Sequence, residues 1–281
     1  MPVSGSALDA DWLGLCRRAV AGLEGMLGEV TSTADRARKT GSRGSGGDET
    51  LVIDESAENI VFAELDALSA AGFRFHAISE ERGEVDYGDT GVRVIIDPID
   101  GSLNAKRGIP HHALSIAVAG GETMADVVFA YVYDFGPAEE WRARLGEGAW
   151  CNGVALDPEA TERRGRDGRL EVIGIESADP RWVAASIDRL VGSSYRLRAL
   201  GTIASSLCQV AGARFDAMLT LHNCRGVDAA AGQLIVREGG GYVSFPRFED
   251  PLGAPLDASP STPVIAARSP ETVRRLEGVP A

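Results

Sequence analysis

The sequence predicts a mixed α+β fold in which helices and largely antiparallel sheets lie in layers. Three observations predict it. Apolar residues recur every three or four positions over residues 8–30, which is the period of an amphipathic helix. Three strand-like runs follow one another closely between residues 113 and 145, which favours an antiparallel meander. Beyond residue 170, helical and strand-like segments alternate.

After the first helix, residues 31–50 are rich in cations and glycines and carry few apolar anchors. This composition is typical of a mobile surface loop. A second interpretation stays open, because Arg38, Lys39 and Arg43 lie just before an acidic stretch. The segment would then be a flap near an anionic substrate.

The rest of the first half is expected to be mainly strands. Residues 51–53 are predicted as a short strand that ends at Asp54, and residues 57–68 as a helix. The other strands are expected over residues 73–77, 92–96, 113–119, 127–133 and 139–145.

Glycines make residues 146–153 an expected turn region. The second half should then alternate strands and helices. Its strands are expected over residues 170–175, 215–221, 241–245 and 263–267, and its helices over residues 180–190, 202–211 and 228–238. Two halves, residues 1–145 and 146–281, are expected to pack as one compact unit.

Composition narrows the function classes. The 281 residues include 28 lysines and arginines against 41 acids, a net charge of -13, which argues against nucleic acid and anionic membranes as partners. There is no signal-peptide pattern and no apolar run of about 18 residues, so a cytoplasmic protein is expected. The four cysteines show no metal-ligand spacing and are expected to be reduced thiols: Cys16, Cys151, Cys208 and Cys224.

The segment "IIDPIDGS" carries the strongest chemical signal. Pro98 is expected to end the strand and turn the chain, so that Asp97, Asp100 and the carbonyl of Ile99 converge. Convergent oxygens are what a hard divalent cation prefers. Gly101 permits close backbone approach, and a helix that begins there offers N–H groups to an anion. Taken alone, the segment is better explained as an acidic turn capped by Asp100.

Three other acids also stand at the expected end of a strand or start of a helix. Asp54 and Glu80 each follow a strand-like run, and Asp228 opens the helix over 228–238. Strand ends gathered at one edge of a sheet are where ligand-binding groups collect. Taken singly, Glu80 also fits a solvated pair with Glu81, and Asp228 a helix N-cap.

These motifs, together with "GEGAWCNG" and "VDAAAGQLIVREGGG", resemble the inositol monophosphatase family of magnesium-dependent, lithium-sensitive sugar phosphatases. The resemblance runs in order from about residue 50 to residue 245. In motif detail it is nearest to the dual inositol monophosphatase/fructose-1,6-bisphosphatase enzymes. It implies a layered αβαβα sandwich, usually as a homodimer, with the active site between the two halves.

The resemblance also implies roles for individual residues. It gives two or three Mg²⁺ ions to a set of oxygen ligands: Glu80, Asp97, the carbonyl of Ile99, Asp100 and Asp228. Asp54 and Ser102 would orient the attacking water, which a metal on Glu80 acidifies. The phosphate and the rest of the substrate would meet Gly101, Ser102, Gly201, Thr202 and Arg225.

Two positions bear on the substrate. Inositol-specific members place a glutamate seven residues before the last metal aspartate, where this chain has Leu221. Arg225 would meet a second phosphate or a sugar hydroxyl through its fork, or else form a surface salt bridge. The sugar is therefore not fixed by the resemblance.

The predicted function is a Mg²⁺-dependent phosphomonoester hydrolase of small sugar or polyol phosphates that uses metal-activated water. The alternatives are a fructose-1,6-bisphosphatase, a 3'-phosphoadenosine 5'-phosphate phosphatase and a histidinol-phosphate phosphatase. A non-catalytic relative that binds metal or phosphate is the alternative from another class. Asp54 argues against it, because a binding module has no need to orient water.

Overall fold

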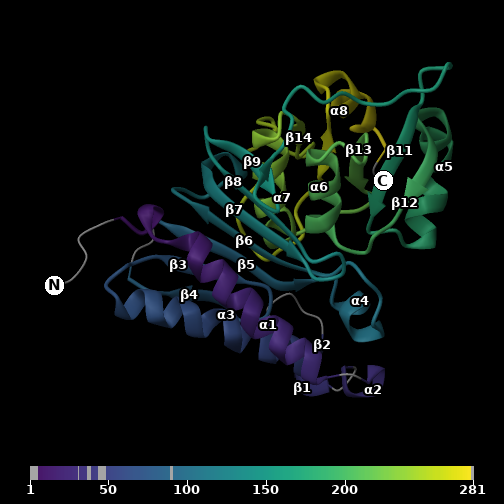
Figure 1. Cartoon of the computed structure of the whole chain (residues 1–281). Coiled ribbons are helices and arrows are strands. Elements are labelled where there is room, and N and C mark those ends of the chain that lie inside the picture. The colour runs from purple at the N-terminus through teal and green to yellow at the C-terminus, as the bar shows by residue number, and fades with distance from the viewer. Residues whose placement is uncertain (1–5, 31, 37–38, 44–48, 89–90, 280–281) are drawn as a thin grey trace.

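The computed structural model describes residues 6–30, 32–36, 39–43, 49–88 and 91–279, with backbone alone for 39–43 and 49–51. Its helices and sheets stack in the order α, β, α, β, α (Figure 1). The predicted layered α+β fold with largely antiparallel sheets is thus confirmed. No helix among the described residues is long and apolar enough to cross a membrane.

Two helices form the first layer. Helix α1 (Trp12–Glu29) packs against α3 (Val52–Ala70), and both contact the larger sheet. The buried side chains of α1 recur at helical spacing, because one stripe faces the core: Trp12, Leu15, Cys16, Ala19, Val20, Leu23 and Leu27. The helix predicted near the N-terminus is therefore confirmed.

The larger sheet has eight strands in the order β10-β9-β8-β7-β6-β5-β3-β4. All neighbouring strands are antiparallel except β3 and β5, which are parallel. The meander predicted between residues 113 and 145 is confirmed. The strands are β3 (His76–Ser79), β4 (Gly83–Asp86), β5 (Arg93–Asp100), β6 (Ala113–Ala119), β7 (Val127–Asp134), β8 (Glu139–Arg144), β9 (Gly148–Cys151) and β10 (Val154–Ala155).

Two predictions in this sheet were wrong. The strand predicted over residues 73–77 begins only at His76. Pro98 does not end β5, which runs on to Asp100 with a register shift against β6 between Asp97 and Asp100. A bulge accommodates a proline because the missing N–H falls where the ladder is already interrupted.

The glycine-rich region 146–153 is also more ordered than predicted, since β9 lies within it. Trp150 and Cys151 pair with β8, and Ala149 is buried, so the short apolar run adds a strand to the sheet. Strand β10 ends at residue 155 and the second sheet begins at residue 170. The division of the chain at residue 145 stays a prediction.

The segment around residues 31–53 differs from its prediction as well. It contains helix α2 (Thr33–Arg36) and a two-stranded sheet of β1 (Lys39–Arg43) and β2 (Glu49–Leu51). Ile53 and Asp54 belong to the first turn of α3, not to a strand, because acidic side chains favour a helix N-terminus. The side chains of Arg38, Lys39 and Arg43 lie outside the described residues, so the flap interpretation stays a prediction.

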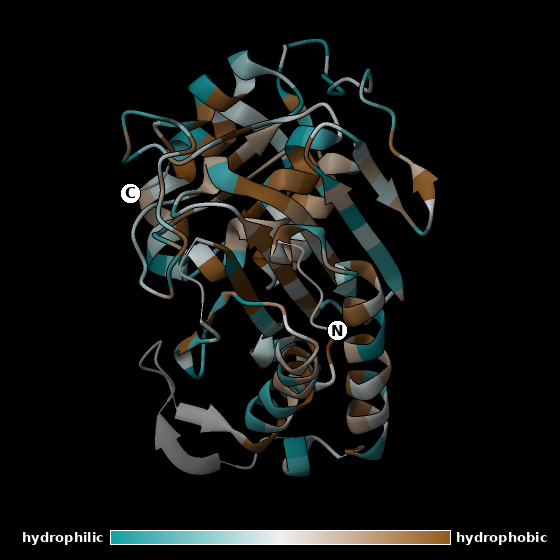
Figure 2. Cartoon of the chain, turned by 90° about the vertical axis from the view of Figure 1, so that its left-hand side faces the viewer, coloured by the Kyte–Doolittle hydropathy of each residue, from teal (hydrophilic) through white to brown (hydrophobic). Residues whose placement is uncertain are grey.

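The middle layer consists of α6 (Ile203–Ala211) and α7 (Gly226–Glu238). Every residue of α6 is buried, as are the first eleven of α7, because both helices lie between the two sheets. Small side chains such as Ala229, Ala230 and Gly232 permit this close approach. Figure 2 shows the hydrophobic colour gathering on these inner elements and the hydrophilic colour on the outer loops.

The smaller sheet has the order β12-β11-β13-β15-β14, with β11 parallel to both of its neighbours. Its strands are β11 (Leu170–Glu176), β12 (Ser194–Arg198), β13 (Ala217–Thr220), β14 (Tyr242–Ser244) and β15 (Ile265–Ala267). Helices α5 (Pro180–Ser193) and α8 (Pro270–Leu276) form the last layer. Strand β12 was not predicted, because it is a largely exposed edge without an apolar run.

Candidate active site

The ends of β3 and β5 and the start of α7 bring three acids together. Glu80 follows β3, Asp97 lies in β5, and Asp228 lies in the first turn of α7. One carboxylate oxygen from each lies within 4.8 Å of the others. Three of the predicted metal ligands, distant in sequence, therefore share one place.

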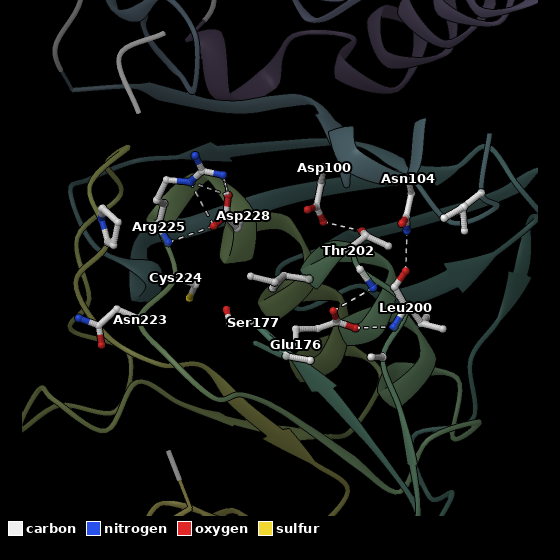
Figure 3. A pocket seen from close by; sticks show the side chains of 16 residues that line it. Asp100, Asn104, Glu176, Ser177, Leu200, Thr202, Asn223, Cys224, Arg225 and Asp228 are labelled. Atoms are coloured by element: carbon white, nitrogen blue, oxygen red, sulfur yellow. Dashed lines mark hydrogen bonds and ion pairs between the residues drawn. The ribbon is translucent and has the colours of Figure 1, made fainter. Parts of the chain in front are cut away.

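Asp100 lies three residues beyond Asp97 and is held from the other half of the chain. Its Oδ2 accepts hydrogen bonds from the Thr202 hydroxyl and from the Ala204 N–H, each at 2.6 Å. Thr202 is also the N-cap of α6 and accepts a bond from the Ser205 N–H. The start of α6 is thus fixed to a predicted metal ligand (Figure 3).

Burial and neighbouring charges raise the pKa values of Asp97, Glu80 and Asp100. Burial raises the pKa of Asp97 well above its ordinary value, and nearby carboxylates raise it further. Burial, opposed by Arg225, raises the pKa of Glu80 to about 7, and burial raises that of Asp100 to about 8. A bound divalent cation would offset this repulsion, and a site made only of oxygens fits a hard cation such as Mg²⁺.

Asp54 and Ser102 lie beside the same acids. They line a small cavity together with Glu80, Glu81, Asp97, Pro98 and Ile99. The Ser102 hydroxyl donates to the Ile99 carbonyl at 3.0 Å, and the Ile99 N–H donates to Oδ1 of Asp97 at 3.0 Å. The turn between β5 and the short helix α4 (Ser102–Arg107) is thus held by its own polar groups.

Two glycines let the turn approach the loop that precedes α6. Gly101 has φ 89°, and a Cβ there would lie 2.9 Å from the Gly201 carbonyl oxygen. Gly201 has φ 81°, and a Cβ there would lie 2.8 Å from Nδ2 of Asn104. Both positions need glycine for conformation and for space.

Arg225 lies immediately before α7 and spans two of the clustered carboxylates. Its Nε lies 3.1 Å and its Nη2 3.0 Å from Oδ1 of Asp228, and its Nη1 donates to Oε1 of Glu80. Burial alone would lower the arginine's pKa, but the surrounding carboxylates outweigh burial and raise it. The salt-bridge interpretation is the one observed, although only 19% of the Arg225 side chain is exposed.

Beside these groups lies an open cavity of about 670 Å³. Asp100, Thr202, Arg225 and Asp228 line it, and Figure 3 shows their side chains around a common hollow. Leu221 does not line it: that side chain is fully buried in the core of the smaller sheet.

Sequence reasoning missed several polar groups of this cavity. Glu176 ends β11, is 3% exposed, and accepts bonds from the N–H groups of Leu200 and Gly201 and from the Ser206 hydroxyl. Burial raises its pKa to about 7. A carboxylate at a strand end was the signal that would have found it.

Asn104 and Asn223 were also missed. Nδ2 of Asn104 donates to the carbonyls of His111 at 2.8 Å and Leu200 at 2.6 Å, so it ties α4 to the loop before α6. Asn223 lines the same cavity.

A sequence model of the inositol monophosphatase family matches residues 16–276. The chain belongs to this family. A fructose-1,6-bisphosphatase/inositol-1-monophosphatase of Thermococcus kodakarensis is 30% identical over 266 residues, covering 92% of this chain and 93% of the relative. The Nus factor SuhB of Escherichia coli K12 is 34% identical over 197 residues, covering 68% and 70%.

Solved structures of similar proteins agree with this family assignment. An inositol monophosphatase-fructose 1,6-bisphosphatase has a TM-score of 0.80 at 25% identity, over 96% of this chain and 100% of that one. The extragenic suppressor protein SuhB of Bartonella henselae has a TM-score of 0.74 at 26% identity, over 95% and 97%. The inositol monophosphatase family and these relatives indicate a phosphatase.

Proposed function

We propose that the protein is a Mg²⁺-dependent phosphomonoester hydrolase that acts on small sugar or polyol phosphates. One observation carries the proposal: oxygens of Glu80, Asp97 and Asp228 lie within 4.8 Å of one another, next to the turn at Gly101. Carboxylates gathered this closely suit a divalent cation, and a turn that opens a helix suits a phosphate.

In this proposal the metal ligands are Glu80, Asp97, the Ile99 carbonyl, Asp100 and Asp228, for two or three Mg²⁺ ions. The bound metal supplies a water of lowered pKa and charge stabilisation for the leaving oxygen. Asp54 and Ser102 hold and orient the attacking water, since both line the small cavity beside Asp97. Gly101 and Ser102 bind the phosphate oxygens through their backbone N–H groups. No covalent nucleophile is needed.

The larger cavity holds the rest of the substrate. Its volume of about 670 Å³ has room for a sugar or polyol beyond the phosphate. Gly201, Thr202 and Arg225 are the proposed contacts, and all three line it. The names of the Thermococcus relative suggest inositol 1-phosphate and fructose 1,6-bisphosphate as the first substrates to try.

A substrate panel tests the proposal. Purified protein with Mg²⁺ is given inositol 1-phosphate, fructose 1,6-bisphosphate, 3'-phosphoadenosine 5'-phosphate and histidinol phosphate, and kcat/KM is compared. We expect turnover of at least one sugar or polyol phosphate. Preferential turnover of 3'-phosphoadenosine 5'-phosphate or of histidinol phosphate would instead assign the protein the corresponding phosphatase activity. Mg²⁺ binding without turnover of any ester would support the non-catalytic alternative.

The remaining expectations belong to the same proposal. We propose a cytoplasmic homodimer with lithium-sensitive activity that binds neither nucleic acid nor membranes. The described cysteines form no disulfide, and three of the four are buried, in keeping with reduced thiols.

A further inference from the structure

Arg225 contacts both carboxylate oxygens of Asp228. Oδ1 accepts a hydrogen bond from the Nε–H at 3.1 Å and lies 3.0 Å from Nη2 in an ion pair, while Oδ2 accepts the Arg225 backbone N–H at 3.1 Å and shares the Nε–H at 3.3 Å. An ionised carboxylate offers about four lone-pair sites. Among the described residues, three nitrogens of Arg225 contact the Asp228 carboxylate, and Nε is shared between the two oxygens.

The same guanidinium also reaches the second member of the cluster. Its Nη1 donates to Oε1 of Glu80, while Nη2 remains on Asp228. The planar fork therefore lies between two of the three carboxylates that converge within 4.8 Å. A divalent cation held by Glu80 and Asp228 would bind the same two carboxylates as the guanidinium of Arg225.

We infer that Arg225 is an internal cation that competes with the metal for Glu80 and Asp228 and so sets the metal affinity of the site. The inference rests on the metal site of the proposed function. Binding of Mg²⁺ there would place a second cation on carboxylates that Arg225 already neutralises. Removing the guanidinium also removes a positive charge beside the metal.

The direction of the effect distinguishes this role from a positioning role. A residue that only orients metal ligands strengthens binding, so its loss weakens binding. A residue that competes with the metal weakens metal binding, so its loss strengthens binding. Charge repulsion at a distance of about 4 Å is large enough in a partly buried site that Arg225→Ala should bind Mg²⁺ roughly tenfold more tightly.

The test is calorimetric titration of chelator-treated protein with Mg²⁺, together with thermal unfolding before Mg²⁺ is added. Arg225→Ala should lower the Mg²⁺ Kd and lower Tm in the absence of Mg²⁺. Arg225→Lys keeps the charge but loses the fork, so its Kd should lie between those of Arg225→Ala and the native protein. If the alanine variant does not fold without metal, the Mg²⁺ Kd of Arg225→Lys alone serves as the test.

The matched control is Arg17→Ala, because Arg17 makes a two-pronged pair with Glu140 away from the cavity. Its Mg²⁺ Kd should equal that of the native protein. Unchanged or weaker Mg²⁺ binding by both Arg225 variants would overturn the inference and leave the proposed function standing. If none of the proteins binds Mg²⁺, the metal site of the proposed function is wrong, and this inference falls with it.

Discussion

The hydroxyl of Thr202 lies 2.6 Å from Oδ2 of Asp100, across 102 residues of sequence. Asp100 ends a strand of the larger sheet, and Thr202 caps the helix that packs against both sheets. One hydrogen bond thus joins a proposed metal ligand to the proposed substrate loop. The geometry of each depends on the other.

Thr202→Val removes this hydroxyl while nearly conserving volume. Oδ2 of Asp100 then keeps only the Ala204 N–H, and α6 loses its N-cap acceptor. Loss of a group that orients a metal ligand typically costs about 10- to 100-fold in metal affinity. Calorimetry should show this loss for Thr202→Val and little change for Thr202→Ser. Native affinity in the valine variant would contradict the proposed link.

The variant Asp54→Asn should lower kcat without weakening Mg²⁺ binding. Asp54 lies in the first turn of α3 and is proposed to orient water, not to hold a metal. We expect kcat to fall about 10²- to 10⁴-fold, while the Mg²⁺ Kd changes little. Glu55→Gln, the exposed neighbour in the same helical turn, should keep native kcat. A Mg²⁺ Kd that rises in parallel with the loss of kcat would instead make Asp54 a metal ligand.

Gly101→Ala and Gly108→Ala form a matched pair at the two ends of α4. Both glycines have positive φ, 89° and 66°, so alanine costs about 1–2 kcal/mol of backbone strain at either. Only at Gly101 would the Cβ meet backbone atoms, 2.9 Å from the Gly201 carbonyl. Urea unfolding should therefore show a larger loss of stability for Gly101→Ala. Equal losses would mean that the turn and the loop are not in tight contact.

Glu176→Gln tests the buried carboxyl behind the substrate loop. Its pKa is raised from 4.5 to about 7, mainly by burial. Below pH 4.5 the group is protonated in both the folded and the unfolded chain. Between pH 4.5 and 7 only the folded chain keeps the proton, so the carboxyl's contribution to stability falls as pH rises, by on the order of 3 kcal/mol.

The measurement for Glu176 is the free energy of unfolding of the native protein minus that of Glu176→Gln, followed from pH 4 to about pH 8. Groups common to both proteins cancel in this difference. It should decrease through the window between the two pKa values and then level off. A flat or rising difference would show that the Glu176 pKa is not raised.

Much of the site was predictable because its acidic residues and glycine stand in recognisable sequence patterns. Asp97, Asp100 and Gly101 stand in one short segment, and Asp228 opens a clear helical pattern. The pairing of Arg225 with Glu80 was not predictable, because it depends on how β3 is placed against α7. Glu176 was missed for the same reason: its partners lie 24 to 30 residues away.

Elements were predictable where the apolar pattern is clear, as in the buried stripe of α1 and the fully buried run of β6. Prediction failed where tertiary contacts decide. Pro98 was expected to stop β5, but the bulge against β6 absorbs it.

The most direct test of the central claim is the release of inorganic phosphate from the best substrate of the panel. The assay follows native protein and Asp97→Asn with Mg²⁺, after addition of a chelator, and after Mg²⁺ is restored. The account predicts release by native protein that stops with the chelator and returns with Mg²⁺, and none by Asp97→Asn. Release that persists in the chelator, or full activity of Asp97→Asn, would contradict it.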